Sequence, residues 1–279
     1  MIIEVDDFNL RDTVTCGQIF RYEELNDGSF IIVLKDRIIK IKQEKNKLIV
    51  KSSNNDNLEN VIRDYFDLNN YYKKINDYII ERDINNKLII DSSVGLKIIN
   101  EPKFEVIISY ILSSNNRVSQ IKKALDNISK RYGRQITFED NNYYLFPSLE
   151  EISDCKIEEL RELKTGFRDK YIYEFINKVK NNEFDIDKIN NMDSETAINY
   201  LKTLNGVGEK VASCILLFGF HRFDVFPIDT WVKKYMKEKY GVDDVKIIKK
   251  IMKEKYNEYS GIAIQYAFNY KRNKSWCEP

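Results

Sequence analysis

Apolar positions along the 279-residue chain follow two different periods. Between Ser29 and Ser52, short runs of Ile and Val are broken by polar residues at 36–37 and 44–47, a pattern typical of an antiparallel meander of strands. From residue 57 to residue 93 the apolar residues instead recur at spacings of three and four, as on one face of a helix. The first 95 residues therefore predict an α+β unit built on an antiparallel sheet.

No strand is predicted after Gly95, where the helical period continues. The pattern indicates helices at 102–113, 117–131, 148–163, 168–181, 194–203, 209–219, 229–240, 243–255 and 259–272. Pro102 stands in the first turn of the first of these helices, where proline is tolerated. We therefore predict an α+β fold of two domains, an antiparallel sheet domain at 1–95 and a larger all-α domain at 96–279.

The composition is that of a soluble globular protein, with 43% hydrophobic and 32% charged residues. The N-terminus is acidic and has no basic segment followed by an apolar one, so no secretory signal is predicted. The longest nearly apolar run, Val211–Phe220, is about half the length of a membrane span. We expect a cytoplasmic protein that does not enter the membrane.

Cysteine and histidine usage narrows the chemistry. The four cysteines, Cys16, Cys155, Cys214 and Cys277, form no closely spaced pair, which argues against a disulfide framework, a zinc ribbon or an iron-sulfur cluster. The single histidine, His221, excludes most sites that need several imidazole groups. We expect no metal site, and any catalysis must use carboxylates, lysine or backbone groups.

The net charge of +1 conceals an uneven distribution. Residues 201–279 contain 15 Lys and Arg against 9 Asp and Glu, whereas the remainder of the chain has 30 against 35. A basic C-terminal third suits contact with a phosphate backbone. Lysine-rich helices with solvated faces explain the same charges equally well, so charge alone does not decide between them.

The segment "LNGVGEK" at 204–210 predicts a tight turn between two helices. Gly206 and Gly208 allow backbone conformations closed to other residues, and the amides that begin the second helix are then free to meet a phosphate. Lys210 falls in the first turn of that helix, with Cys214 four residues later on the same face. The alternatives are a helix C-cap with no ligand and an ordinary surface lysine.

Asp229 in "DVFPIDTW" precedes another predicted helix. Its simplest role is that of an N-cap, worth about 1 kcal/mol of helix stability. A cap also holds the carboxylate rigidly, which suits a catalytic group. Because one helix and one loop separate Lys210 from Asp229, an amine and a carboxylate can converge at the mouth of the hairpin.

In combination, "LNGVGEKVASCILLFGF" and "VFPIDTW" resemble the helix-hairpin-helix DNA glycosylases, and Lys210 matches the lysine of their bifunctional members. Within that superfamily the sequence is most similar to the 8-oxoguanine DNA glycosylases of the type first known from eukaryotes. Four further stretches carry this likeness, "CGQIFRY" at 16–22, "EVIISYILSSNNRVSQI" at 105–121, "LKTGFRDKYI" at 163–172 and "YSGIAIQYAF" at 259–268. The likeness covers nearly the whole chain, and the lack of a four-cysteine cluster separates it from the endonuclease III branch.

The resemblance implies a role for each matching residue around a flipped base. Lys210 would be the nucleophile and Asp229 its electrostatic and proton-transfer partner. Gly17 would offer its backbone carbonyl to the N7 hydrogen that oxidised guanine has and guanine lacks, while Cys214 and Phe268 would lie against the two faces of the base. Taken singly, Gly17 also fits a simple turn, and Cys214 and Phe268 fit core positions.

On the DNA side, the resemblance implies that Asn115 fills the gap in the duplex, that Arg168 contacts the orphaned cytosine and that Phe167 wedges nearby. The hairpin glycines would grip a phosphate, with a monovalent cation held by carbonyl groups of the turn at 204–209 and no other cofactor. Taken singly, Asn115 fits a loop capping residue and Arg168 a solvated residue at a helix start.

Two positions depart from the family pattern. The glutamine expected three residues after Gly261 is replaced by Ile264, and Gln265 follows it. Gln265 is the candidate base-pocket glutamine, but one residue turns its direction by about 100° on a helix. The arginine expected after "SSNN" is replaced by Gln120, which suggests a relaxed preference for cytosine opposite the lesion.

The resemblance implies a monomeric repair enzyme that acts on double-stranded DNA containing oxidised guanine. It would cleave the N-glycosidic bond and then nick the strand by β-elimination. Two alternatives stay open, a glycosylase of the same superfamily for another damaged purine and a non-catalytic DNA-binding module.

Overall fold

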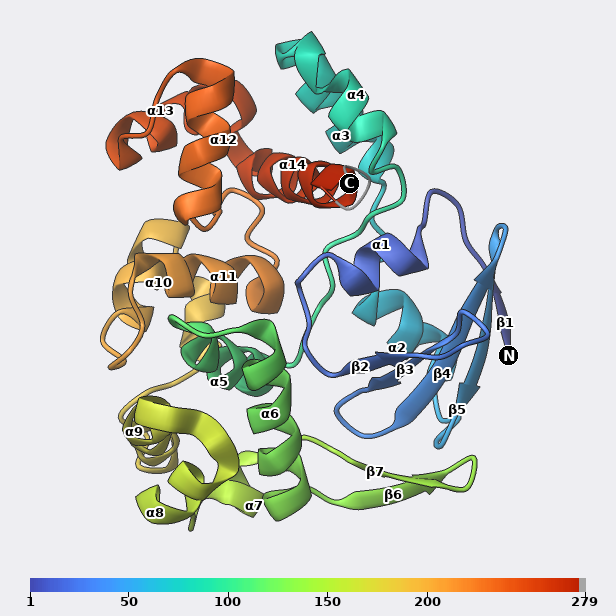
Figure 1. Ribbon diagram of the computed structural model, residues 1–279, viewed down its shortest axis with the longest axis vertical. Helices are drawn as coiled ribbons and strands as arrows, with labels where there is room; N and C mark the ends of the chain where they lie inside the picture. Colours follow the sequence, from blue (N-terminus) through green and yellow to red (C-terminus); the bar gives the residue numbers. More distant parts are fainter. Residues whose placement is uncertain (276–279) are drawn as a thin grey trace.

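The computed structural model describes the backbone of residues 1–275 and the side chains of residues 1–273. A five-stranded antiparallel sheet lies on one side of the molecule, and most of the helices lie on the other (Figure 1). The strands are β1 Ile2–Glu4, β2 Tyr22–Glu24, β3 Phe30–Val33, β4 Ile38–Glu44 and β5 Lys47–Ser52, in the order β1-β5-β4-β3-β2. The predicted meander is confirmed as β3 to β5, and β1 and β2 add an edge strand on each side.

Alternation along the strands gives the sheet two apolar faces. On one face, side chains such as Ile32, Ile39 and Val50 pack with helices α1 Leu10–Thr15 and α2 Leu58–Tyr65. On the other face, Ile31 and Ile38 form a separate cluster with Leu145 from the helical part. The sheet is therefore covered on both faces by different parts of the chain.

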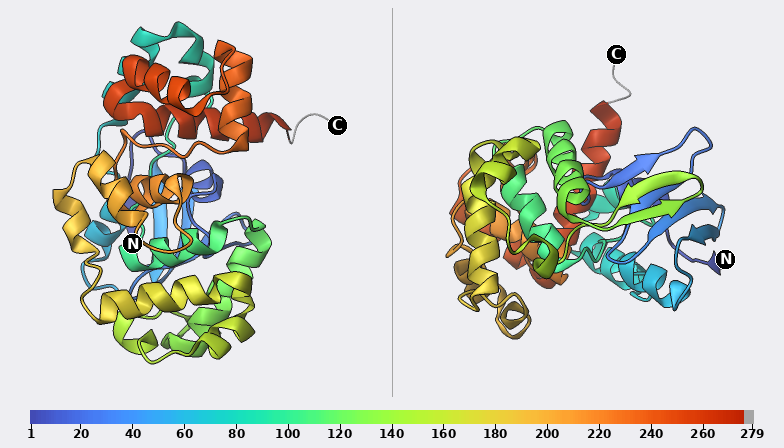
Figure 2. Two further views of the ribbon diagram at one scale, coloured as in Figure 1. Left: turned by 90° about the vertical axis from the view of Figure 1, so that its left-hand side faces the viewer. Right: turned by 90° about the horizontal axis from the view of Figure 1, so that it is seen from below.

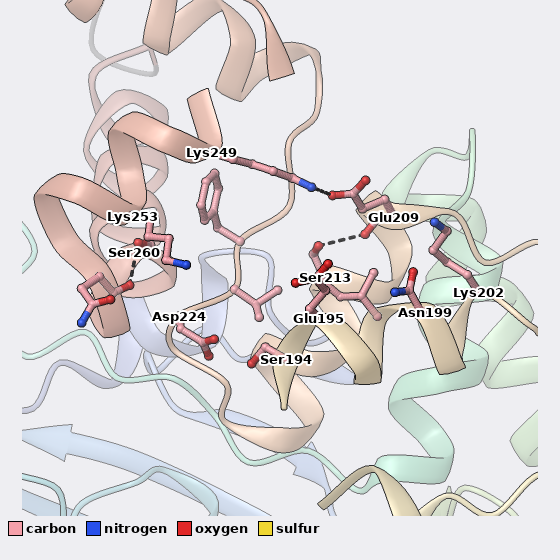
Figure 3. A pocket seen from close by; sticks show the side chains of 14 residues that line it. Ser194, Glu195, Asn199, Lys202, Glu209, Ser213, Asp224, Lys249, Lys253 and Ser260 are labelled. Atoms are coloured by element: carbon pink, nitrogen blue, oxygen red, sulfur yellow. Dashed lines mark hydrogen bonds and ion pairs between the residues drawn. The ribbon is translucent and has the colours of Figure 1, made fainter. Parts of the chain in front are cut away.

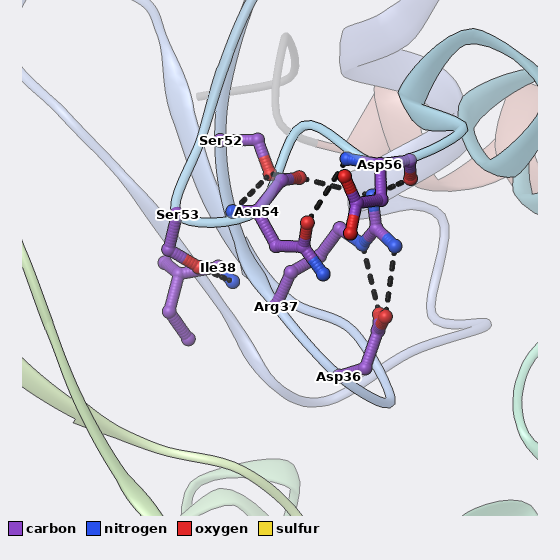
Figure 4. Close-up of polar contacts among 7 residues, drawn as sticks. All are labelled: Asp36, Arg37, Ile38, Ser52, Ser53, Asn54 and Asp56. Carbon is purple, nitrogen blue, oxygen red and sulfur yellow. Dashed lines mark hydrogen bonds and ion pairs between the residues drawn. The ribbon is translucent and has the colours of Figure 1, made fainter.

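A polar cluster joins the turn between β3 and β4 to the loop that follows β5 (Figure 4). The buried guanidinium of Arg37 donates to the carbonyl oxygens of Asn54 and Asp56, at 2.9 and 2.8 Å, and pairs with the carboxylate of Asp36. The amide of Ile38 donates to the hydroxyl of Ser53 at 2.9 Å. The bonds from Arg37 satisfy loop carbonyls that the sheet leaves unpaired.

The helices form the larger part of the molecule (Figures 1 and 2). Beyond α1 and α2 they are α3 Tyr72–Arg82, α4 Lys87–Asp91, α5 Lys103–Ser113, α6 Val118–Tyr132, α7 Leu149–Ile152, α8 Ile157–Leu160, α9 Asp169–Lys180, α10 Ser194–Leu201, α11 Glu209–Phe220, α12 Thr230–Tyr240, α13 Val245–Tyr256 and α14 Ser260–Ser275. In the described part of the chain, no helix is long and apolar enough to cross a membrane.

The prediction of an all-α second part is wrong at one place. Strands β6 Gln135–Phe138 and β7 Asn141–Tyr144 form an antiparallel hairpin that reaches from α6 to the sheet (Figures 1 and 2). Its turn residues, Glu139 and Asp140, both have positive φ values, 46° and 62°. Such turns are normally marked by Asn and Gly, so this pair carried no hairpin signal.

The predicted helix at 148–163 is broken into α7 and α8. Ser148 caps α7 in a capping box with Glu151, and the chain then restarts at Ile157. A π-helical turn, Arg161–Thr165, follows α8, and it contains Lys164 at φ 69°. This bend, together with Gly166 at φ 61°, places Phe167 and Arg168 at a corner rather than along a continuous helix.

The hydrophobic cores do not divide at residue 95. Side chains of α3 and α4, among them Tyr72, Ile79 and Ile90, belong to the same apolar cluster as the C-terminal helices. Helix α3 packs on α13 and α4 packs on α14, and Figure 1 shows these helices together at one end of the molecule. The boundary between 1–95 and 96–279 stays a prediction, and the cores indicate that α3 and α4 pack as part of the helical body.

Candidate active site

The predicted hairpin joins α10 to α11 through residues 202–208. The amide of Val207 donates to the carbonyl oxygen of Leu204 at 3.1 Å, which closes the turn. Gly206 has φ +83°, and a Cβ there would lie 2.5 Å from the ring of Tyr171, so the position requires glycine. Gly208 is the N-cap of α11 and supplies no side chain to bond the first amides of the helix. The start of α11 therefore has no side-chain cap, and the phosphate contact at this turn stays a prediction.

A cavity of about 450 Å³ lies next to the hairpin, between α10, α11 and α13 (Figure 3). Lys202, Glu209 and Lys249 are among its lining residues, and Lys249 forms an ion pair with Glu209. None of the predicted site residues lines it. Lys210 and Cys214 come one position after Glu209 and Ser213, so they occupy the adjacent face of α11.

Lys210, Cys214 and Asp229 are brought together. Burial raises the pKa of the Cys214 thiol to about 11, while the positive charge of Lys210 lowers this pKa and the negative charge of Asp229 raises it. Both charged groups therefore act on the same thiol, although they come from different helices. Lys210 and Asp229 are each half-buried, and Cys214 is buried. The predicted convergence of an amine and a carboxylate beside the hairpin is consistent with this arrangement.

Asp229 is the N-cap of α12. Its Oδ1 accepts a hydrogen bond from the amide of Val232 at 2.8 Å, which confirms the capping role expected from the sequence. The cap fixes the carboxylate in one orientation at the start of the helix. A group held in this way keeps its position while a ligand enters.

Gly17 and Phe268 lie against each other near the start of α12. Gly17 is exposed and has φ +85°, and a Cβ placed on it would lie 3.7 Å from Cε1 of Phe268. The ring of Trp231 meets the ring of Phe268 edge to face, with centroids 5.1 Å apart. Sequence reasoning missed Trp231, because an aromatic residue in the first turn of a helix is normally a packing residue.

Gln265 does not occupy the position of its neighbour. Its side chain is buried, and its Nε2 donates to the carbonyl oxygen of Cys16 at 3.1 Å. Ile264 is buried in the apolar core of the helical part. The place at which the family pattern has a glutamine therefore holds no hydrogen-bonding group, and the nearby amide is bonded to the loop before Gly17.

Asn115, Phe167 and Arg168 form a second cluster. The guanidinium of Arg168 donates to the carbonyl oxygen of Ser114 at 2.8 Å and to that of Asn115 at 2.8 Å. It also lies over the ring of Phe167, 4.2 Å from the centroid. Asn115 is exposed at φ 49°, and Phe167 is 53% exposed. Arg168 thus holds the loop that presents Asn115, while Phe167 projects beside it.

Tyr171 links the two clusters. Its ring packs on Gly206 of the hairpin and meets the ring of Phe167 edge to face, with centroids 6.2 Å apart. The hairpin and the Phe167 corner are therefore neighbours on the surface. Among residues 1–273, no group of three His, Cys, Asp or Glu side chains is placed to hold a metal ion.

Comparison with known families accounts for nearly the whole chain. Residues 1–107 match the family model of the 8-oxoguanine DNA glycosylase N-terminal domain. Residues 108–258 match that of the HhH-GPD superfamily of base excision DNA repair proteins. The chain belongs to the HhH-GPD superfamily. The resemblance inferred from the hairpin and the aspartate is thereby confirmed, as is the order of a sheet region followed by a helical HhH-GPD region.

Relatives of this HhH-GPD protein span most of its length. A probable N-glycosylase/DNA lyase of Methanothermobacter thermautotrophicus is 27% identical over 98% of this chain and 96% of its own. The N-glycosylase/DNA lyase of Saccharomyces cerevisiae is 29% identical over 92% of this chain and 75% of its own.

Solved structures share the fold. The structure of MBOgg1 in complex with a low affinity DNA ligand superimposes with a TM-score of 0.93 at 34% identity, covering 98% of this chain and 96% of that one. The 8-oxoguanine glycosylase/lyase of Clostridium acetobutylicum, in complex with dsDNA containing cytosine opposite 8-oxoG, gives a TM-score of 0.91 at 32% identity, over 99% and 98% of the two chains.

Proposed function

We propose that this HhH-GPD protein is a bifunctional 8-oxoguanine DNA glycosylase and AP lyase. The observation that carries the proposal is that Lys210, in the first turn of α11 after the hairpin, and the capped carboxylate of Asp229 both lie near the buried Cys214, while Gly17 packs on Phe268. The relatives named N-glycosylase/DNA lyase and the solved 8-oxoguanine glycosylase/lyase support it. The substrate is duplex DNA, so we place the enzyme with the DNA of the cell.

Lys210 is proposed as the nucleophile. Its ammonium group first gives up a proton, and the amine then attacks C1′ of the damaged nucleotide. The bond between C1′ and the base breaks, and the base leaves with that electron pair and takes up a proton. Opening of the sugar gives a Schiff base, and loss of a C2′ proton then expels the 3′ phosphate. Asp229 stabilises the positive charge that develops on the sugar and moves protons.

The base pocket is proposed to read the lesion at N7. The Gly17 carbonyl accepts the N7 hydrogen of oxidised guanine, while Cys214 and Phe268 lie against the faces of the flipped base. Cys214 suits this position because its raised pKa keeps the thiol neutral, so it packs as a small apolar group. Asn115 and Phe167 fill the space that the base leaves in the duplex.

The amides of Gly206 and of residues 208–210, at the start of α11, are proposed to bind a phosphate next to the lesion. This contact offsets part of the free-energy cost of unstacking the flipped base, which is a few kcal/mol. A monovalent cation held by carbonyl groups of the turn at 204–209 fits the same proposal, since a cation near the bound phosphate strengthens the contact.

Borohydride reduction in the presence of an 8-oxoguanine duplex tests the proposal. Wild-type protein is expected to form a covalent adduct and to nick the strand, and Lys210→Gln is expected to do neither while still binding the duplex. Adduct formation by Lys210→Gln at the wild-type level would remove the nucleophile assignment. Binding without any product from the wild type would instead indicate a non-catalytic DNA-binding module.

A broader substrate range is favoured by one observation. Ile264 is buried where the family pattern has a glutamine, so the Watson-Crick edge of the base has no amide partner at that position. A glycosylase for another damaged purine would share Lys210 and the hairpin. Excision of ring-opened and alkylated purines, compared with 8-oxoguanine against all four opposing bases, separates the two activities.

A further inference from the structure

One face of α14 holds the loop that contains Gly17. Gln265, Phe268 and Arg272 are spaced by three and four residues, so they share a face of the helix. Each contacts a different residue of the loop. Gln265 donates to the carbonyl oxygen of Cys16 at 3.1 Å, Phe268 packs on Gly17, and Arg272 donates to the carbonyl oxygen of Thr15 and, at 3.1 Å, to its hydroxyl.

The peptides on both sides of the Gly17 carbonyl are fixed by hydrogen bonds from the helical part. Before Gly17, the carbonyl of Cys16 is held by Gln265. After it, the carbonyl oxygen of Gln18 accepts the hydroxyl of Tyr110 at 3.2 Å. The Gly17 carbonyl lies between these two fixed peptides, in a residue with φ +85° that only glycine adopts readily. Its direction is therefore set by its neighbours.

The side chain of Gln18 anchors the loop on a third side. Its amide donates to the carbonyl oxygen of Lys97 at 2.7 Å and accepts from the amide of Ile99 at 2.9 Å. Gln18 is buried, and these bonds attach the loop to the segment that leads into α5. Cys16 is also held from α1, because its amide donates to the carbonyl oxygen of Asp12 at 3.1 Å. The contacts from α14 therefore act where the fixed end of α1 meets Gly17.

We propose that Gln265 is a positioning residue that aims the Gly17 carbonyl at N7 of the flipped base, and that it does not read the base itself. This deepens the proposed function and rests on it. Gln265 is only 7% exposed, and its Nε2 already donates to the carbonyl oxygen of Cys16. Oxidised guanine differs from guanine by a C8 oxo group and an N7 hydrogen, and only the N7 hydrogen is a donor that a carbonyl can accept. The direction of the Gly17 carbonyl therefore controls this part of the specificity of the enzyme.

The test compares two substrates that differ in the need for base recognition. One is a duplex with 8-oxoguanine opposite cytosine, which needs the Gly17 carbonyl. The other is a duplex with a preformed abasic site, which needs Lys210 but has no base to read. In Gln265→Met, the kcat/KM for excision is expected to fall about tenfold further than the nicking rate, because loss of one hydrogen bond of ordinary strength changes a rate by about that factor.

Two further variants sharpen the test. Arg272→Met removes the contact to Thr15 and is expected to lower the ratio of the kcat/KM for 8-oxoguanine excision to the rate of abasic-site nicking. Lys271→Met changes an exposed neighbour on α14 that pairs with Glu238, and it is expected to leave both rates and their ratio at the wild-type values. Melting temperatures of all variants identify any that fail to fold.

Different results contradict the proposed function and the positioning role of Gln265. If the wild type nicks abasic sites but does not excise 8-oxoguanine, the proposed function is wrong whatever the variants do. If the wild type excises 8-oxoguanine and Gln265→Met loses both activities equally, or neither, the positioning role of Gln265 is overturned.

Discussion

Asp229 has two roles that a pair of substitutions can separate. It caps α12 through a bond to the amide of Val232, and its charge acts on the thiol of Cys214 beside Lys210. Asparagine caps helices about as well as aspartate, because its side-chain oxygen accepts the same bond. It carries no charge, so Asp229→Asn removes the electrostatic role alone.

We predict that Asp229→Asn keeps the melting temperature and DNA binding of the wild type but loses turnover by about a hundredfold or more, the usual effect of removing a catalytic acid or base. Asp244 offers a matched control, since it caps α13 in the same way through the amides of Lys246 and Ile247. Asp244→Ala is expected to cost about 1 kcal/mol of stability and to leave turnover unchanged. Unchanged turnover in Asp229→Asn would reduce Asp229 to a cap.

The hairpin β6–β7 is the element by which the helical part covers the face of the sheet that carries Ile31 and Ile38. Ile136, Phe138 and Leu145 pack with Ile31 and Ile38 of the sheet. Glu139 at the tip pairs with Lys40 and Lys51. Exposed ion pairs contribute little to stability, whereas buried apolar side chains contribute several kcal/mol. The apolar contacts therefore hold the hairpin in place.

Paired variants test this ranking. Leu145→Ala is expected to lower the free energy of unfolding by about 2–5 kcal/mol, because the side chain is fully enclosed and leaves a cavity. Glu139→Gln is expected to lower it by less than about 1 kcal/mol. Urea unfolding measures both values, and a larger effect at Glu139 than at Leu145 would show that charge rather than packing holds the hairpin.

Elements were predictable from sequence where periodicity and capping agreed. Helix α5 begins at Lys103 and α12 at Thr230, each within one residue of the predicted start. The hairpin β6–β7 was missed because its strands are short and because Glu139 and Asp140 adopt positive φ without the usual turn residues. The break before α8 was missed because apolar spacing continues across it.

At the scale of the whole molecule, the residues of the site come from widely separated segments. The candidate site residues could be identified from sequence motifs. The contact between Gln265 and Cys16, in contrast, joins residues 249 positions apart. No local pattern reports such a pairing. The packing of α3 and α4 on the C-terminal helices could not be predicted for the same reason. An amphipathic pattern shows which face of a helix is buried, but it does not show which element covers that face.

Two carboxyl groups lie where the sheet region meets α5. Glu105 pairs with Arg21 at 3.2 Å, and Glu101 accepts the hydroxyl of Tyr65 at 2.6 Å. Burial and the neighbouring Glu105 raise the pKa of Glu101 to about 8, from an ordinary value of 4.5. Between these values the unfolded chain gives up this proton while the folded protein keeps it. The contribution of Glu101 to the free energy of unfolding is therefore fully present below pH 4.5 and is lost as the pH rises through 8.

We predict that Glu101→Gln removes this pH dependence, because the amide keeps an acceptor for Tyr65 and cannot ionise. Urea unfolding measures the free energy of unfolding of Glu101→Gln and of the wild type at each pH. The difference, variant minus wild type, is expected to be larger at pH 8 than at pH 5. Glu150→Gln, at an exposed position in α7, serves as the control and should show no such change. An equal difference between Glu101→Gln and the wild type at both pH values would contradict the assigned cause.

Peptide mapping of the complex trapped by borohydride tests the role of Lys210 most directly. Trypsin does not cut after a modified lysine, so the adduct is expected on the peptide 203–222, with the cut after Lys210 missing. Attachment of the sugar to Lys210 is the predicted result. Attachment to any other lysine, or to the N-terminal amine of Met1, would contradict it.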